Sequence, residues 1–214
     1  MFQNIDWANL QNPHLFINGD CMEYMKTMPD KYVDLCICDP PYGIGNFVQI
    51  TGNVRGKKVT WNDSIPPDIY FKELERVSKE RIIWGANYYN CFNDKGGAIV
   101  WYKQVPPESN LSECEIASYS RLKRVGYVHL KWQNINRTEA TIHPCQKPVA
   151  LYKWLLKNYA KPGDKILDTH VGSASSLVAC HNLGFQYVGF EIDADYYRMA
   201  TERLEAVKAQ ERLF

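Results

Sequence analysis

The stretch VDLCICDPPY, residues 33–42, joins an apolar run to an acid, two prolines and a tyrosine. Only Asp34 interrupts the apolar run, a pattern typical of a strand that is buried on both faces of a parallel sheet. Asp39 follows at the carboxyl end of that strand, the edge at which α/β proteins bind ligands. The stretch therefore predicts an α/β fold with a functional site at residues 39–42.

Runs typical of strands and helices alternate along the rest of the chain, without a repeat or a linker. This alternation predicts an α/β fold with a mostly parallel sheet. A single domain spanning residues 1–214 fits the usual size of roughly 100–200 residues. The predicted strands are residues 14–18, 33–38, 81–84, 98–101, 113–120, 165–168 and 187–190, and the predicted helices are 20–28, 68–79, 148–159, 173–183 and a last one after Glu191.

The composition is that of a soluble globular protein, with 45% hydrophobic and 23% charged residues and a net charge of +1. No run approaches the roughly 20 apolar residues of a membrane span. The first six residues lack the features of a secretory signal. The seven cysteines include no CxxC pair that would indicate zinc or redox chemistry. We therefore expect a cytoplasmic protein with no bound metal and no membrane contact.

The backbone of Asp39-Pro40-Pro41-Tyr42 is stiff and extended, because each proline restricts its own φ and the residue before it. An exocyclic amine of a nucleobase is a poor nucleophile, since its lone pair is conjugated into the ring. If Asp39 and the Pro40 carbonyl accept its two N–H bonds, the nitrogen can direct its lone pair at a methyl donor, and the carboxylate stabilises the growing positive charge. Tyr42 can stack on the base, which contributes about 1–3 kcal/mol.

A second strand-end motif, LDTHVGS at residues 167–173, combines Asp168 with a small-residue turn and the start of a helix. Gly172 lets a cofactor approach the backbone, and the helix N-terminus favours a negative group such as a carboxylate. Glu191 ends the next predicted strand about twenty residues later, a spacing at which an acid commonly binds ribose hydroxyls. The two elements predict a site for a nucleoside-containing cofactor.

Residues 18–20 with Glu23, 33–42, 143–148, 165–173 and 189–193 together carry a family resemblance. The chain resembles the N6-adenine and N4-cytosine DNA methyltransferases whose catalytic motif precedes the cofactor motif, the beta group. The resemblance implies S-adenosylmethionine as cofactor and a Rossmann-like fold with a mostly parallel seven-stranded sheet and helices on both faces. Because the chain ends one helix after Glu191, residues 14–18 would supply the neighbouring strand, as in a circularly permuted methyltransferase.

The resemblance also assigns roles to single residues. Asp39, Pro40 and Tyr42 would be catalytic. Lys147 would face the donor carboxylate, Glu191 the ribose and Asp20 the adenine, while the turn after Asp168 would line the methionine end. The expected cofactor-binding residues are Asp20, Lys147, Asp168, His170, Gly172, Ser173 and Glu191.

Three residues of the cofactor turn differ from the family pattern, which has proline, phenylalanine and glycine where this chain has Thr169, His170 and Ala174. His170 can still pack a flat ring against the donor, and Ala174 loses only backbone freedom. Cys145 lies in a Pro-Cys-Gln tripeptide like that of cytosine C5-methyltransferases, but methylation of an amine needs no thiolate nucleophile. We interpret Cys145 as incidental.

Residues 43–60 and 121–138 each contain basic side chains and no acid, which suggests contact with a polyanion. We expect residues 43–62 to form a mobile loop that closes over a flipped base. Residues 121–142 lie where the family has target-recognition sequence and would form a short insertion of that kind. The predicted DNA-binding residues are Arg55, Lys57, Lys58, Arg121, Lys123, Arg124, Lys131 and Arg137.

The leading hypothesis is site-specific N6-methylation of adenine in double-stranded DNA, because N4-cytosine enzymes more often carry serine in place of Asp39. N4-cytosine methylation, an RNA or protein-amide target, and a donor- or DNA-binding module with impaired catalysis stay open. The resemblance places the protein in a bacterial or phage-infected cell. The sequence does not decide the recognition sequence, nor whether a homodimer or a cognate restriction enzyme accompanies the activity.

Overall fold

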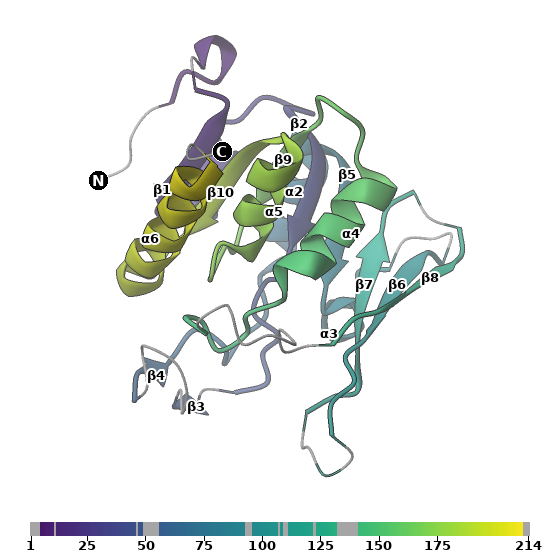
Figure 1. Ribbon diagram of the computed structural model, residues 1–214. Coiled ribbons are helices and arrows are strands. Elements are labelled where there is room, and N and C mark those ends of the chain that lie inside the picture. Colours follow the sequence, from purple (N-terminus) through teal and green to yellow (C-terminus); the bar gives the residue numbers. More distant parts are fainter. Residues whose placement is uncertain are drawn as a thin grey trace.

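The computed structural model describes residues 5–10, 12–45, 47–48, 56–92, 96–106, 108, 111–121, 123–131 and 141–211, with backbone alone at 47, 48 and 211. Within these ranges, eight strands form one sheet at the centre of the molecule, in the order β1-β10-β9-β2-β5-β7-β6-β8 (Figure 1). The strands are β1 (His14–Asn18), β2 (Val33–Cys38), β5 (Ser78–Trp84), β6 (Ala98–Tyr102), β7 (Cys114–Tyr119), β8 (Val125–His129), β9 (Lys165–Asp168) and β10 (Gln186–Glu191).

The first five strands in this order run parallel to one another, whereas β7 runs antiparallel to both β5 and β6. The predicted α/β class and largely parallel sheet are confirmed. The predicted count of seven strands is wrong, because β8 adds an eighth strand beside β6. β8 lies inside the basic segment 121–142, and only Val128 of this edge strand is buried. Its sequence therefore lacks the alternation of apolar and polar residues that marks a half-buried strand.

The first strand of the chain lies beside the last one. β1 pairs in parallel with β10, and Asn18 stands opposite Glu191. The Asn18 side-chain amide donates to the Glu191 carbonyl at 2.8 Å, and the Gly19 N–H donates to the same carbonyl at 3.0 Å. The position predicted for residues 14–18 is confirmed.

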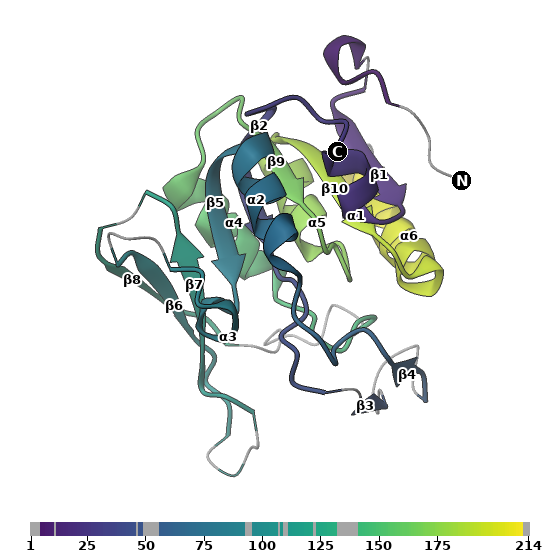
Figure 2. The same cartoon turned by 180° about the vertical axis from the view of Figure 1, so that it is seen from behind.

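Helices cover both faces of the sheet, as predicted (Figures 1 and 2). One face carries α4 (Val149–Tyr159), α5 (Ser175–Leu183) and α6 (Ala194–Glu211), and the other carries α1 (Cys21–Met25) and α2 (Asp68–Val77). Successive residues of β2 alternate between the two cores: Leu35 and Ile37 belong to the core under α4 and α5, and Cys36 and Cys38 to the core under α1 and α2. This double burial is the reason that the sequence of β2 is an almost continuous apolar run.

The helices predicted at residues 20–28 and 148–159 are shorter in the structure, where α1 spans Cys21–Met25 and α4 spans Val149–Tyr159. Two further helix boundaries differ from the prediction for local reasons. α2 ends at Val77 rather than Lys79, because Ser78 already begins β5. α5 begins at Ser175 rather than Ser173, because Ala174 adopts a left-handed φ of +64°. Ala174 therefore occupies a conformation that favours glycine, so it carries backbone strain as well as the loss of freedom that we expected.

Several short elements were not predicted, because they are too short to show a periodic pattern. β3 (Phe47–Val48) and β4 (Lys58–Val59) pair as an antiparallel ribbon inside segment 43–62. α3 (Ala86–Tyr89) follows β5, and a 3-10 turn (Trp7–Asn9) precedes β1. Among the described helices, none is both long and apolar enough to cross a membrane.

The sheet places three acids at one edge. Asp39 follows β2, Asp168 ends β9 and Glu191 ends β10, and these three strands are adjacent and parallel. Parallel strands end at the same side of a sheet, so the two sequence motifs meet there. The edge with these acids is the position of the candidate site.

We predict that Gly189→Ala lowers the free energy of unfolding by about 1–3 kcal/mol, because it overpacks the contact between β10 and the turn after β9. A Cβ atom on Gly189 would lie 2.7 Å from Cγ2 of Val171 and 3.0 Å from Cδ1 of Leu177. Urea denaturation measures the effect. Ala206→Val, on the exposed side of α6, is the control and should change stability by about 0.5 kcal/mol at most. Wild-type stability of Gly189→Ala would contradict the prediction.

Candidate active site

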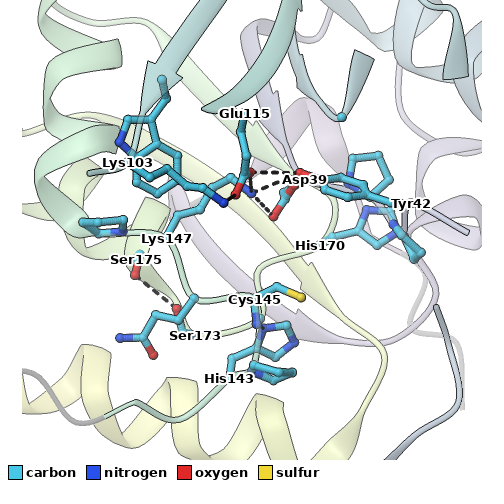
Figure 3. Close-up of a pocket in the computed structure, with 18 of the residues that line it drawn as sticks. Asp39, Tyr42, Lys103, Glu115, His143, Cys145, Lys147, His170, Ser173 and Ser175 are labelled. Atoms are coloured by element: carbon cyan, nitrogen blue, oxygen red, sulfur yellow. Dashed lines mark hydrogen bonds and ion pairs between the residues drawn. The ribbon is translucent and has the colours of Figure 1, made fainter. Parts of the chain in front are cut away.

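A cavity of about 940 Å³ opens at the carboxyl edge of the sheet. Its lining includes Asp39 and Tyr42 from the first motif and His170, Gly172 and Ser173 from the second. Cavities of about 300–1,000 Å³ are typical of ligand sites in proteins. The two motifs that the sequence singled out therefore face one common space, which Figure 3 shows from close by.

Asp39 is part of a cluster of buried charges. The Tyr42 hydroxyl donates to Oδ1 of Asp39 at 2.5 Å, and Nζ of Lys147 lies 2.5 Å from Oδ2. Lys147 also lies 2.9 Å from Oε2 of Glu115, whose Oε1 is 3.1 Å from Nζ of Lys103. Figure 3 shows the two lysines and the two acids converging from different parts of the chain. Glu115 lies in β7 and Lys103 follows β6, and the sequence analysis predicted neither as a site residue.

The position of Lys147 differs from our expectation. It was predicted to face a donor carboxylate, but its ammonium group lies between Asp39 and Glu115. Burial disfavours the cation, yet the two carboxylates outweigh burial and raise the pKa of Lys147 above its usual range. Burial likewise raises the pKa of Glu115, but Lys147 and Lys103 outweigh it and lower that pKa to about 2. Burial, with a contribution from Glu115, raises the pKa of Asp39 despite the nearby Lys147.

The Pro40 carbonyl also has a partner that the sequence did not predict. The Tyr89 hydroxyl donates to this carbonyl at 2.5 Å and to the Pro41 carbonyl at 3.0 Å. A carbonyl oxygen has two lone pairs, so the Pro40 carbonyl can accept a second hydrogen bond. Tyr89 thus holds the proline turn in place, and the Pro40 carbonyl oxygen keeps a lone pair for a second donor.

The Tyr42 ring stacks on Tyr88, with ring centroids 4.8 Å apart and an interplanar angle of 17°. Tyr88 lies in α3 and its side chain is partly exposed at the cavity. Gly85 lies so close that a Cβ atom on it would be 2.4 Å from the Tyr42 ring. The ring is therefore confined by its surroundings, and Tyr88 is a second aromatic residue at the same place.

In the second motif, the backbone holds the acids in place. Asp168 accepts hydrogen bonds from the His170 N–H at 3.0 Å and from the Ser176 hydroxyl at 2.5 Å. Glu191 accepts from the Gly172 N–H at 2.8 Å, so the ends of β9 and β10 are joined across the turn. Burial raises the pKa of Asp168 to about 7, against the lowering effect of these hydrogen bonds. Burial lowers the pKa of His170 to about 4, so the ring is neutral near pH 7.

A second, smaller cavity of about 70 Å³ lies on the other side of Glu191. Asp20, Phe190 and Ile192 line it, and His170 and Glu191 line both cavities. Asp20 is the N-cap of α1, where its carboxylate accepts a hydrogen bond from the Met22 N–H at 2.9 Å. Asp20, Glu191 and Asp168 therefore follow one another along the sheet edge, but Asp168 is buried and is not part of the lining of either cavity.

The His143 ring covers the turn after Asp168. A Cβ atom on Gly172 would lie 3.2 Å from Nδ1 of His143, and Gly172 has a left-handed φ of +54°. Trp61 stacks on His143 with centroids 5.5 Å apart, and Tyr196 contacts the ring edge-on at 4.5 Å. Burial lowers the pKa of His143 to about 3. Segment 43–62 thus reaches the cofactor motif through Trp61.

The predicted DNA-binding residues divide into groups. Lys57 forms ion pairs with Asp193 at 2.6 Å and Asp195 at 2.7 Å. Arg121 pairs with Glu80. Lys58, Lys123, Arg124 and Lys131 are exposed, as is Arg121, and the remaining two, Arg55 and Arg137, lie outside the described residues.

Comparison with known proteins decides the family. The profile of a family described as DNA methylase matches residues 83–202, more than half of the chain. The chain belongs to the N6/N4 DNA methylase family.

Curated proteins that are named as methyltransferases resemble this chain over most of its length. The DNA adenine methyltransferase YhdJ of Escherichia coli (strain K12) is 24% identical over 254 residues, which cover 88% of this chain and 82% of YhdJ. The type II methyltransferase M.HinfI of Haemophilus influenzae is 24% identical over 245 residues, which cover 90% of this chain and 68% of that enzyme.

Solved structures of DNA methylases share the fold of this family member. The M1.HpyAVI–SAM complex matches with a TM-score of 0.60 and 20% identity, over 88% of this chain and 98% of that one. The cytosine-N4-specific PvuII DNA methyltransferase matches with a TM-score of 0.60 and 10% identity, over 93% of this chain and 94% of that one.

We predict that Gly85→Ala in this DNA methylase displaces the Tyr42 ring and lowers methylation at least tenfold. A Cβ atom would collide with the ring, and Gly85 has a φ of +76°, at which alanine costs roughly 1–2 kcal/mol. Methylation assays and urea denaturation separate the two effects. Gly163→Ala, at an exposed turn with a φ of +89° and open space around the Cβ position, is the matched control for strain alone. Equal activity of the two variants would contradict the prediction.

We predict that Asp168 makes the protein less stable as the pH rises from about 4 to about 7. In this window the folded protein keeps a proton on Asp168, whose pKa is raised to about 7, whereas the unfolded chain has released it. The contribution of Asp168 to the free energy of unfolding then falls with rising pH by up to ~1.4 kcal/mol per unit. Urea denaturation of wild type and Asp168→Asn at several pH values measures the difference. Parallel pH dependences of the two proteins would refute the raised pKa.

Proposed function

We propose that this DNA methylase transfers a methyl group from S-adenosylmethionine to the N6 amine of adenine in double-stranded DNA. The observation that carries the proposal is the shared cavity, which Asp39, Pro40 and Tyr42 line together with the turn after Asp168. One side offers acceptors and a stacking surface for an amine on a base, and the other offers a turn suited to a donor. Both reactants of a direct transfer can therefore meet without a covalent intermediate on the enzyme.

The donor-side residues fit S-adenosylmethionine, which supplies a methyl group activated on a sulfonium sulfur. Asp20 and Phe190, which line the smaller cavity, suit contact with the adenine, and Glu191, which lines both cavities, suits the ribose hydroxyls. The turn around Gly172 has its backbone open to the larger cavity and suits the methionine end. The β1–β10 pairing also supports interpretation of the chain as a beta-group, circularly permuted methyltransferase.

In the proposed mechanism, Asp39 and the Pro40 carbonyl accept the two N–H bonds of a flipped base, while Tyr42 stacks on its ring. The amine lone pair then forms the new N–C bond as the C–S bond of the donor breaks, and the electron pair of that bond stays on sulfur. Asp39 stabilises the positive charge on nitrogen and accepts the proton that the methylated amine loses. Tyr42 holds Asp39 in place through the hydroxyl hydrogen bond.

Three observations bear on the choice of base. Asp39, rather than serine, supports adenine by family resemblance, and YhdJ is an adenine methyltransferase. The match to the cytosine-N4-specific PvuII enzyme supports N4-cytosine as the second candidate, since both amines need the same two acceptors.

The altered cofactor turn is compatible with catalysis rather than with an impaired module. The Thr169 hydroxyl shares a 2.6 Å hydrogen bond with the buried Tyr70 hydroxyl, so the residue in the place of proline is integrated into the core. Ala174 adopts the backbone conformation that glycine favours. The substituted residues are therefore accommodated by a buried hydrogen bond and by a left-handed backbone conformation.

We further propose that the whole chain acts as a single methyltransferase domain, with segments 43–62 and 121–142 contacting double-stranded DNA. Exposed Lys58, Lys123, Arg124 and Lys131 support this assignment. The relation to type II methyltransferases such as M.HinfI makes a cognate restriction enzyme and a bacterial host the natural setting to test.

The decisive experiment is expression in a bacterial host that lacks DNA methylation, followed by sequencing of its genome for modified bases. We expect N6-methyladenine at one short recognition sequence. N4-methylcytosine as the only product would replace the first candidate by the second. A genome without either modification, from cells that contain folded protein, would refute the proposed function.

We predict that Asp39→Ala lowers kcat at least 10²-fold and leaves the Kd for S-adenosylmethionine within about threefold of wild type, because Asp39 contacts the amine and not the donor. Methylation assays with labelled donor and calorimetric titration measure the two quantities. Asp63→Ala, at an exposed position outside the cavity lining, is the control. Equal losses of donor binding and turnover would place Asp39 on the donor side instead.

A further inference from the structure

The buried cluster around Asp39 contains a second carboxylate whose role the proposed mechanism does not use. Asp39, Glu115, Lys103 and Lys147 come from four separate parts of the chain and converge at the cavity (Figure 3). The side chains of Lys147 and Lys103 are only 4% and 9% exposed, so their charges depend on the acids for compensation. Two carboxylates balance two ammonium groups, and removal of either acid leaves a buried positive charge.

Lys147 competes with a target amine for Asp39. Its ammonium group lies 2.5 Å from Oδ2 of Asp39, and the Tyr42 hydroxyl donates to Oδ1, so a target amine would be a third donor to this carboxylate. A cation held against the carboxylate also cancels the charge that would stabilise a positive amine nitrogen. Strong catalysis by Asp39 therefore requires Lys147 to move away from it.

Glu115 provides the place to which Lys147 can move. Its Oε2 already lies 2.9 Å from Nζ of Lys147, so the ammonium group can leave Asp39 and keep a carboxylate partner. Lys103 contacts the other oxygen, Oε1, and orients Glu115 with Oε2 towards Lys147. Without Glu115, release of Asp39 would leave Lys147 buried and unpaired, at a cost that favours the closed ion pair.

We propose that Glu115 is a positioning residue for methyl transfer, which draws Lys147 away from Asp39 and so leaves the Asp39 carboxylate available to the target amine. The proposal rests on the proposed function, because it assigns Asp39 to the amine. Glu115 itself touches neither the base nor the donor in this scheme. Its effect should therefore appear in kcat and in the state of Asp39, rather than in donor binding.

The pH profile distinguishes this role from a purely structural one. The groups that face Asp39 in the site are Lys147, Glu115 and Tyr42, with Tyr89, Cys145, Tyr152 and Asp168 farther away. Burial raises the pKa of Asp39, and the negative charge of Glu115 raises it further. Loss of that charge lowers the pKa of Asp39, so the acid limb of the kcat profile should move to lower pH even as the plateau falls.

The test is Glu115→Gln in the full-length protein, assayed with labelled S-adenosylmethionine and a DNA that the wild type methylates. We expect kcat to fall about 10- to 100-fold, as for loss of one charge-assisted hydrogen bond. The acid limb should shift to lower pH, and the donor Kd from calorimetry should stay within about twofold of wild type. Glu113→Gln, which removes an exposed acid two residues away, is the matched control and should behave as wild type.

Two further variants keep the result interpretable. Glu115→Asp retains the charge and should recover part of kcat. The double variant Lys103→Met with Glu115→Gln restores a neutral cluster but gives Lys147 no second carboxylate, so kcat should stay low. Recovery of kcat to the wild-type value would show that charge balance alone matters and would overturn the proposal.

Failure of this inference and failure of the proposed function give different experimental results. Wild-type kcat and an unshifted acid limb in Glu115→Gln, while the wild type methylates DNA, would overturn the role of Glu115 alone. A wild-type protein that binds the donor but methylates no DNA would overturn the proposed function and this inference with it.

Discussion

The parallel pairing of β10, β9 and β2 is the constraint on which the site depends. Because adjacent parallel strands end at one edge, Asp39, Asp168 and Glu191 lie together although they are far apart in the chain. The same pairing requires strands that are covered on both faces, which the two helix layers provide. Packing of the cores and assembly of the site are thus consequences of one topology.

Acids gathered at a partly buried edge repel one another and are costly to ionise, and the protein compensates for this in two ways. At the turn after β9, backbone N–H groups and a serine hydroxyl hold Asp168 and Glu191, and Asp168 still keeps a raised pKa. After β2, Lys147 and Lys103 balance the charges of Asp39 and Glu115. Backbone N–H groups keep the turn after β9 rigid, whereas a lysine side chain between two carboxylates can move from one to the other.

Most of the fold could be predicted from local patterns. The strand bounds of β1, β2 and β9 agree with the predicted ranges, because buried strands and their turns leave strong apolar and glycine signals. β8 was missed because an edge strand with one buried side chain carries no such signal. For the site, the motif residues were found where the chemistry is local in sequence, as in Asp39–Tyr42 and around Asp168.

The sequence by itself determined the α/β class, the two strand-end motifs and the acids that they carry, because each depends on residues within a few positions of one another. Only the tertiary structure decided that Lys147 pairs with Asp39 and Glu115, that Tyr88 stacks on Tyr42, and that Lys57 pairs with Asp193. These contacts join distant segments, and the physical reason is the same for each. A charged or aromatic side chain takes the partner that the packed sheet and its turns bring within reach, and no local pattern records that choice.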